Sequence, residues 1–190
     1  MGKNILIISA SPKKDGNTSL LVEWVAAAAR SKGADVEILN AGTMAFKVSG
    51  CTACRACQKL KDYICVIEDE GKLVLQKMIS AHVIVMATPL YFYGPSAQLK
   101  VIFDRMFSLY KWDNAAGTMR TPLKGKMLAL VLSGFEDVGL DVVEKPFRMT
   151  ADYTGMMFES LLVPNAGVSG EIRNKPGVKD LATAFGKKIA

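Results

Sequence analysis

The stretch 4–30 constrains the fold most strongly, because it changes character twice along a short length of chain. Residues 4–8 form a β-branched run without internal polar interruption, which is typical of a strand buried on both faces of a parallel sheet. Residues 13–19 are polar and end in three residues, 17–19, each of which can cap a helix. Residues 20–29 favour a helix throughout. We therefore expect a strand, a loop and a helix.

The loop between this strand and helix carries several hydroxyl groups. A helix start leaves unpaired N–H groups at its positive dipole end, and hydroxyl side chains add further donors there. The loop has neither the Gly-x-Gly-x-x-Gly spacing nor the Gly-Lys-Ser/Thr ending of the nucleotide fingerprints. Such a socket suits a phosphate monoester, for example the tail of FMN; an ordinary capped loop is the plain alternative. The hydroxyl residues are Ser9, Ser11, Thr18 and Ser19.

Composition indicates one domain over residues 1–190, since half of the 190 residues are apolar and the length suits a single core. The net charge of +6 comes from scattered Lys and Arg, which favours anionic ligands over nucleic acid. No apolar run approaches the roughly 20 residues of a membrane span, and the first residues enter a strand without a signal-peptide pattern. We expect a cytoplasmic protein without nucleic-acid or membrane partners.

The rest of the chain alternates expected strands with expected helices, so the fold class is α/β with a parallel sheet covered by helices on both faces. We expect an edge strand at 35–40 and further strands at 82–87, 126–132 and 158–163, with helices at 71–80, 96–109, 141–157 and after Pro176. The segment 112–122 reads as a loop. Residues 41–70 read as an irregular excursion, longer than a strand-to-helix turn needs.

Three expected loops fall on the rim where ligands bind in such sheets, at the carboxyl ends of the strands. Residues 9–19 can hold a phosphate. Residues 89–94 offer backbone amides and the flat faces of Tyr91, Phe92 and Tyr93, although aromatic residues at strand ends are often core residues. Residues 133–137 supply the third loop. The convergence of the three predicts a binding site at this rim.

In its motifs the chain resembles the flavodoxin-like family of NAD(P)H-dependent FMN reductases and, within it, the iron–sulfur flavoproteins. The resemblance covers nearly the whole chain. It is carried by Ser9-Ala10-Ser11-Pro12 with Gly16-Asn17-Thr18, by Cys51, Cys54 and Cys57 with Cys65 and Glu68-Asp69, by Thr88-Pro89-Leu90-Tyr91, and by Gln98-Leu99-Lys100 with Asp104-Arg105.

The resemblance implies a flavodoxin-like three-layer sandwich with five parallel strands in the order 2-1-3-4-5 and a cysteine-rich insertion at 43–70. It also implies bound FMN and a homodimer or homotetramer. The residues expected to bind the cofactor are Ser9, Ser11, Pro12, Lys13, Asn17, Thr18, Ser19, Pro89, Leu90, Tyr91, Phe92, Tyr93, Gly94, Ser133 and Gly134. The flavin itself performs the hydride chemistry, so no catalytic acid, base or nucleophile is expected from the protein. Lys13 or Arg105 is a candidate for positive charge at the ligand or at a subunit contact.

The cysteines follow the spacing C-x2-C-x2-C-x7-C, and Cys51, Cys54, Cys57 and Cys65 are the only cysteines of the chain. A compact run of this kind can hold a 4Fe–4S cluster. Zinc prefers two separated pairs, and free or redox-active thiols are the other alternative. Val66 stands where ferredoxins commonly have Pro. Arg55, Lys59 and Lys61 lie in the same segment and could offset the charge of a cluster.

Two functions follow from these features. The favoured one is an FMN-dependent oxidoreductase that passes electrons from NAD(P)H, or from a reduced ferredoxin if a cluster is present, to a quinone, flavin, metal or similar small-molecule acceptor. The alternative is a flavodoxin-like electron carrier without small-substrate turnover. The basic net charge favours the enzyme, because flavodoxins are usually strongly acidic. An anion-binding domain without flavin is a third alternative.

Overall fold

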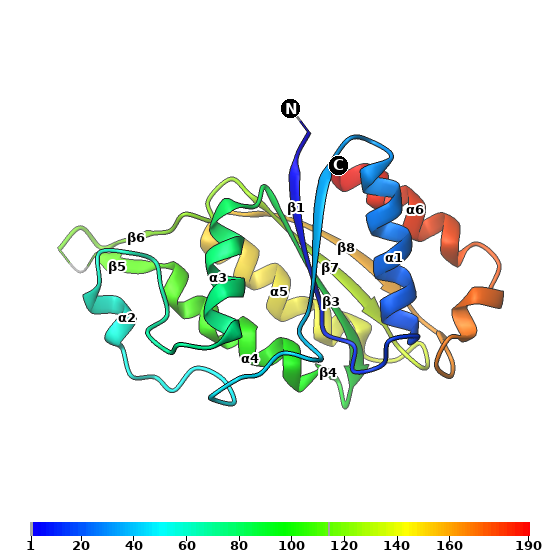
Figure 1. Ribbon diagram of the computed structural model, residues 1–190, viewed down its shortest axis with the longest axis horizontal. Coiled ribbons are helices and arrows are strands. Elements are labelled where there is room, and N and C mark those ends of the chain that lie inside the picture. Colours follow the sequence, from blue (N-terminus) through cyan, green and yellow to red (C-terminus); the bar gives the residue numbers. More distant parts are fainter. Residues whose placement is uncertain (1, 114) are drawn as a thin grey trace.

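Five parallel strands form the centre of the computed structural model, which describes residues 2–113 and 115–190 (Figure 1). They are β1 (Asn4–Ser9), β2 (Asp35–Asn40), β3 (Val83–Tyr91), β7 (Met127–Ser133) and β8 (Met157–Val163). Their order in the sheet is β2-β1-β3-β7-β8. Counted over the parallel strands this is 2-1-3-4-5, which confirms the predicted flavodoxin-like architecture.

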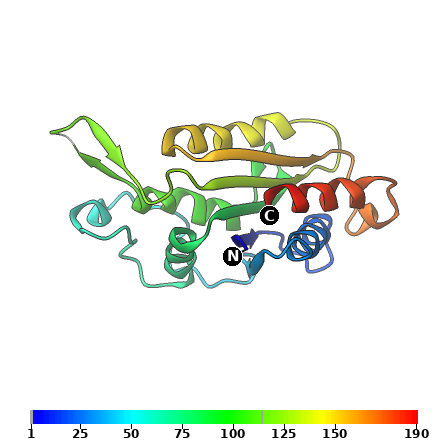
Figure 2. The ribbon, with the colours of Figure 1, turned by 90° about the horizontal axis from the view of Figure 1, so that it is seen from above.

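Helices cover both faces of the sheet, as Figure 2 shows. On one face lie α1 (Asn17–Arg30) and α6 (Val178–Ile189); on the other lie α3 (Glu70–Ser80), α4 (Ala97–Arg105) and α5 (Leu140–Thr154). Three short helical turns complete the set: α2 (Ala56–Lys59), η1 (Met106–Leu109) and η2 (Glu171–Asn174). The expected helix over 96–109 therefore ends as an α-helix at Arg105 and continues as the 3₁₀ turn η1.

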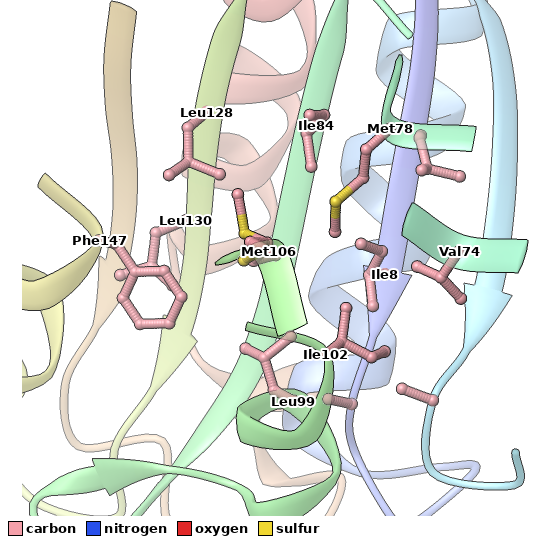
Figure 3. Packing of buried hydrophobic residues seen from close by; sticks show 14 of the residues in the cluster. Ile8, Val74, Met78, Ile84, Leu99, Ile102, Met106, Leu128, Leu130 and Phe147 are labelled. Atoms are coloured by element: carbon pink, nitrogen blue, oxygen red, sulfur yellow. The ribbon is translucent and has the colours of Figure 1, made fainter. Parts of the chain in front are cut away.

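The strands supply two separate hydrophobic layers because successive side chains point to opposite faces. Ile8, Ile84 and Leu130 pack with α3, α4 and α5; in Figure 3, Leu130 lies beside Phe147 and Ile84 lies near Met78. Their neighbours along the strands face α1 and α6 and include Ile7, Val85 and Val131. The uninterrupted apolar runs of the sequence are thus explained by burial on both sides.

Strand β3 extends further than expected and reaches into the segment that was expected to end it. Pro89 lies opposite Ser133 in the parallel pairing with β7, and Leu90 and Tyr91 pair antiparallel with the two-residue strand β4 (Gly94–Pro95). Proline at the end of a strand costs little, because only one ladder hydrogen bond is lost there. The extension carries the residues 89–91 outward onto the rim.

The prediction of a loop over 112–122 was wrong. Two short antiparallel strands, β5 (Lys111–Asp113) and β6 (Thr118–Arg120), form a hairpin that projects from the body of the molecule (Figure 2). Position 114 of the predicted loop lies outside the described residues. Trp112 is paired with Met119 across the two strands, and a cross-strand pair of large apolar side chains stabilises a hairpin. The neighbouring Gly, Asn and Asp had suggested a loop instead.

The cysteine-rich segment is irregular, as predicted. Within residues 41–69, all of which the structure describes, the short helix α2 is the one regular element. Across the described chain, no helix combines the length and apolarity that crossing a bilayer requires.

Candidate functional site

An open pocket of about 320 Å³ lies where the carboxyl ends of the central strands meet the start of α1. We call it the rim pocket. Loops after β1, β3, β7 and β8 form its walls, as expected for a parallel sheet with helices on both faces. It is lined by Ser11, Lys13, Gly16, Asn17, Thr18, Pro89, Leu90, Tyr91, Ser133, Gly134, Phe135, Ala166, Gly167, Val168 and Ser169. The three loops selected from the sequence therefore do converge.

The start of α1 differs from the expectation in one respect. The N-cap is Gly16, and no side chain of the described residues caps the helix, so the prediction that one of the residues 17–19 does so was wrong. A Cβ on Gly16 would lie 3.0 Å from the Ser11 Oγ and 3.2 Å from Lys13, which explains why glycine occupies this close approach. The helix thus presents backbone N–H groups to the pocket without a competing cap.

Hydroxyl groups shape the first loop from within. The Ser11 Oγ donates to the Lys13 carbonyl at 3.0 Å, and the Ser19 Oγ donates to the same carbonyl at 2.8 Å. Thr18 and Ser133 join the first and third loops through a buried hydroxyl–hydroxyl bond of 2.8 Å. These contacts fix the position of the loop relative to the sheet.

The wall formed by residues 166–169 was not anticipated. The Asn17 amide nitrogen donates to the carbonyls of Ala166, Gly167 and Val168 at 3.0–3.1 Å, which binds this wall to the start of α1. Two signals could have revealed it: the segment follows the fifth strand, and it contains Gly167 and is followed directly by Gly170, both of which adopt positive φ. The rule about carboxyl ends of strands applies to this loop as well as to the other three.

The end of β3 and the turn that follows it divide between two pockets. Pro89, Leu90 and Tyr91 line the rim pocket, whereas Phe92 and Tyr93 line a neighbouring pocket of about 290 Å³. Phe92 is fully exposed, and both it and Tyr93 have positive φ values of 45° and 59°. Of the other predicted binding residues, Ser9, Pro12, Ser19 and Gly94 are outside the lining of the rim pocket.

The four cysteines line a second, much smaller pocket, which we call the cysteine pocket. Its other lining residues are Thr52, Arg55, Val66, Ile67, Arg105, Phe107 and Ser108. Cys57 and Cys65 are buried, while Cys51 and Cys54 are exposed. All four are free thiols. The loop reaches this shape through two non-glycine residues in the left-handed region, Ala53 and Arg55.

Thiol environments within the cysteine pocket differ. Burial raises the pKa of the Cys57 thiol above its ordinary value, although a hydrogen bond from Gln58 and the charge of Lys111 act in the opposite direction. The pKa of the exposed Cys54 thiol is lowered, first by the backbone N–H of Ala56 and then by the Thr52 hydroxyl. The inner and outer sides of the pocket therefore favour different thiol states.

A buried ion pair closes the inner side of the cysteine pocket. The Arg105 Nη1 and Nη2 atoms each lie 2.8 Å from one carboxylate oxygen of Asp69, and both side chains are almost completely buried. Burial opposes ionisation of both partners. The mutual hydrogen bonds outweigh it, so the pKa of Asp69 is lowered and that of Arg105 is raised. Arg105, the last residue of α4, therefore lies in the cysteine pocket rather than the rim pocket.

The cysteine pocket fits a thiolate-bound group by its donor set, which is four thiols around one small volume. Over residues 2–113 and 115–190, however, no three or more His, Cys, Asp or Glu side chains stand together at metal-binding geometry. Arg55, Lys59 and Lys61, which the sequence suggested as counter-charges, are exposed. The buried cations beside the thiols are Arg105 and Lys111, and the sequence alone did not identify them in this role.

Comparison with known proteins decides the family. The sequence profile described as NADPH-dependent FMN reductase matches residues 3–163. The chain belongs to this family. The prediction of an NAD(P)H-dependent FMN reductase relationship is thereby confirmed.

Relatives of this family member include iron–sulfur flavoproteins. The chain is 35% identical over 101 residues to an iron–sulfur flavoprotein of Methanocaldococcus jannaschii, a match that covers 53% of this chain and 50% of the relative. An iron–sulfur flavoprotein of Archaeoglobus fulgidus is 28% identical over 188 residues, covering 96% of this chain and 77% of the relative. The match thus spans about half the length of the first of these relatives.

Solved structures of low sequence identity share the fold. An FMN-dependent NADH-azoreductase of Bacillus anthracis in complex with FMN superposes with a TM-score of 0.70 at 14% identity, covering 98% of this chain and 99% of the azoreductase. The NAD(P)H:quinone oxidoreductase of Methanothermobacter marburgensis gives a TM-score of 0.68 at 12% identity, with coverage of 99% and 97%.

Proposed function

We propose that this member of the NADPH-dependent FMN reductase family binds FMN in the rim pocket and works as an oxidoreductase with NADPH or NADH as electron donor. The observation that carries the proposal is the position of the rim pocket between the ends of β1 and β3. That is the switch point of this sheet order, where flavodoxin-like folds place their flavin. The family match supports the same assignment.

The phosphate end of the cofactor is assigned to the first loop and the start of α1. The uncapped N–H groups of α1 favour an anion, and Lys13 adds a positive charge on the pocket lining. Because Gly16 has no side chain, it leaves room for a phosphate to approach the start of α1. Ser11 and Thr18 then orient the loop through their hydroxyl bonds, and Asn17 holds the opposite wall in place.

The ring end is assigned to the end of β3 and to the end of β7 with the loop that follows it. Leu90 and Tyr91 form one side of the rim pocket, and Ser133 and Gly134 form the far side. FMN, when bound, supplies hydride acceptance from a nicotinamide and onward electron transfer. The residues of the chain bind and orient the ring and leave the open mouth of the pocket to the second substrate. Phe92 and Tyr93 belong to the adjoining pocket, which can receive a flat acceptor such as a quinone.

Cys51, Cys54, Cys57 and Cys65 are assigned as ligands of a 4Fe–4S cluster, which would supply one-electron transfer with the flavin and accept electrons from a reduced ferredoxin. The shared lining of the cysteine pocket and the iron–sulfur flavoprotein relatives support this assignment. Reduced thiols in such number also suit a cytoplasmic location. We further propose a homodimer or homotetramer as the working form, and the exposed aromatic residues Phe92 and Trp112 are consistent with subunit contacts.

Anaerobic purification tests the cofactors together. A spectrum with broad absorption near about 400 nm, with iron in several-fold excess over FMN, is the expected result for the cluster. A plain yellow flavin spectrum would remove the cluster and leave free thiols, and zinc without iron would reassign the site. A colourless preparation that does not bind added FMN would overturn the proposal as a whole.

Turnover separates the enzyme from an electron carrier. Oxidation of NADPH or NADH with a quinone or ferric acceptor is expected, whereas a carrier would show no appreciable nicotinamide turnover.

Gly16→Val tests the position of the FMN site. The substitution should abolish FMN binding, because the valine side chain would meet Ser11 and Lys13. The matched control is Ala27→Val, an exposed position on the same helix, which should bind FMN normally.

A further inference from the structure

Around the cysteine pocket there is more buried positive charge than buried negative charge: Arg105 lines the pocket, Asp69 pairs with Arg105, and Lys111 bonds to the Cys57 carbonyl. Arg105 is 1% exposed and Lys111 is 8% exposed, so both are buried, and Asp69 is the carboxylate whose side chain is buried beside them. Counted by themselves, these three groups leave an excess of one positive charge. Burying an uncompensated charge is costly, so this arrangement calls for an anion in the same place.

Arg105 has bonding capacity left after its structural contacts. Besides the two contacts to Asp69, its Nη2 donates to the Ile67 carbonyl at 3.2 Å and approaches the Cys65 sulfur at 3.6 Å. Its Nε is buried and has no hydrogen-bond partner in the part of the chain that the structure describes. A buried N–H without a partner is rare in native proteins and indicates an additional group at the site.

Lys111 approaches the pocket from another element. It lies at the first position of β5, and its ammonium group donates to the Cys57 carbonyl and stands 5.6 Å from the centre of the Tyr63 ring. Two cations from α4 and β5 therefore flank the two buried cysteines, Cys57 and Cys65. The exposed cations Arg55, Lys59 and Lys61 are screened by water and contribute less.

We infer that Arg105 and Lys111 are positioning residues of the cysteine pocket, whose buried charges compensate a negatively charged, thiolate-bound cluster and raise its reduction potential. This inference rests on the proposed cluster assignment. A cluster held by four thiolates is anionic and gains one more negative charge on one-electron reduction. A buried cation therefore stabilises the reduced form more than the oxidised form, and a buried carboxylate does the opposite.

The signs of these effects separate the electrostatic role from a merely structural one. Arg105→Gln and Lys111→Gln each remove a buried positive charge and should make the cluster harder to reduce. Asp69→Asn removes the buried negative charge and should make it easier to reduce. A residue that only holds the segment together would instead cause loss of iron or of folding, whichever member of the pair is changed.

The experiment is a potentiometric titration of the anaerobically purified protein with dithionite as the electron source, followed in the cluster absorption. At a fixed potential, Arg105→Gln should lower the ratio of reduced to oxidised cluster by about tenfold, which is about 59 mV for one electron. Lys111→Gln should shift it in the same direction and Asp69→Asn in the opposite direction. Arg105→Lys, which keeps the charge, should have a reduction potential close to that of the unmodified protein.

Lys61→Gln is the matched control, because it makes the same change of charge at an exposed position of the same segment. Its titration should coincide with that of the unmodified protein. Iron, sulfide and circular dichroism are measured for every variant. If Arg105→Gln does not fold, Lys111→Gln and Asp69→Asn decide the question.

Three results would overturn the inference. Shifts of the same sign for Asp69→Asn and Lys111→Gln would leave only a structural role. Potentials equal to that of Lys61→Gln would show that the buried charges do not act on the cluster. Absence of iron and sulfide from the unmodified protein would instead refute the cluster assignment itself, and the inference with it.

Discussion

The rim pocket and the cysteine pocket obtain their shapes in different ways. Loops at the ends of adjacent, hydrogen-bonded strands form the rim pocket, so the register of the sheet positions its walls. The cysteine pocket lies on an irregular segment, and a few side chains hold it: Arg105 through Asp69, Lys111 through the Cys57 carbonyl, and Gln58 through carbonyls at 3.0–3.1 Å.

This difference predicts where each pocket is vulnerable. Many backbone hydrogen bonds of the sheet hold the walls of the rim pocket, so a single substitution there should have a small effect. The cysteine pocket depends on individual buried polar contacts, so a single substitution there should have a large effect. Substitutions of single side chains can therefore test the comparison directly.

The largest effect is expected for Arg105→Met. It leaves the Asp69 carboxylate buried without its partner, which should lower the free energy of unfolding by about 3–5 kcal/mol. Urea denaturation measures this change. The control is Lys100→Met on the same helix, whose exposed pair with Asp104 should contribute no more than about 1 kcal/mol. Equal losses in the two variants would contradict the special dependence of the cysteine pocket on Arg105.

A smaller effect is expected for Asn17→Ala at the rim pocket. The change removes the donor that holds the wall at 166–168, and about 1–3 kcal/mol of stability should be lost. FMN affinity should also fall about tenfold, because the wall is released. Denaturation and flavin fluorescence titration measure the two quantities. Asn4→Ala, at an exposed position, is the control, and an unchanged affinity in Asn17→Ala would show that the wall does not contact the ligand.

Next in size is Thr18→Val, which keeps the shape of the side chain and removes the hydroxyl bonded to Ser133. The buried Ser133 hydroxyl loses this partner, so the expected cost is about 1–2 kcal/mol. Thermal or urea unfolding checks the value. Thr43→Val, where the hydroxyl is exposed, should cost only a few tenths of that amount, and a comparable loss there would contradict the importance of burial.

The smallest effect is a pH dependence at the cysteine pocket. The pKa of Asp69 is lowered in the folded protein, so the unfolded chain takes up the proton first, and the stability from this group is present above the ordinary Asp pKa of about 3.9. That stability is lost as pH falls through the folded pKa. The difference in unfolding free energy between the unmodified protein and Asp69→Asn should therefore narrow in acid. In the Arg105→Met background, the effect of Asp69→Asn on the unfolding free energy should change less with pH, because Asp69 has lost the arginine that lowers its pKa.

Much of the fold could be predicted because the sheet leaves a direct mark on the sequence. Runs buried on both faces must be apolar throughout, so β1, β3 and β7 were readable, and the alternation in 35–40 revealed an edge strand. The sequence of the β5–β6 hairpin shows neither a continuous apolar run nor a clear alternation of polar and apolar residues. Apart from the buried Lys111, the residues of its two strands are exposed or half-buried, and short exposed strands have the composition of loops.

The sequence likewise predicted only part of the candidate site. The loops after three strands were found, because ligands in these sheets bind at the carboxyl ends. The wall at 166–169 was missed although the same rule covers it. The part played by Arg105 and Lys111 in the cysteine pocket could not be read, since the partners of Arg105 lie 36–40 residues away and those of Lys111 up to 54 residues away.

The bonds from Asn17 have a consequence for synthesis of the protein. Their acceptors follow 149–151 residues later in the chain. On the ribosome, the first helix therefore emerges long before the segment that it must hold. This wall of the rim pocket cannot be held in place until translation has passed Val168, so we expect a nascent chain stalled earlier to capture flavin poorly.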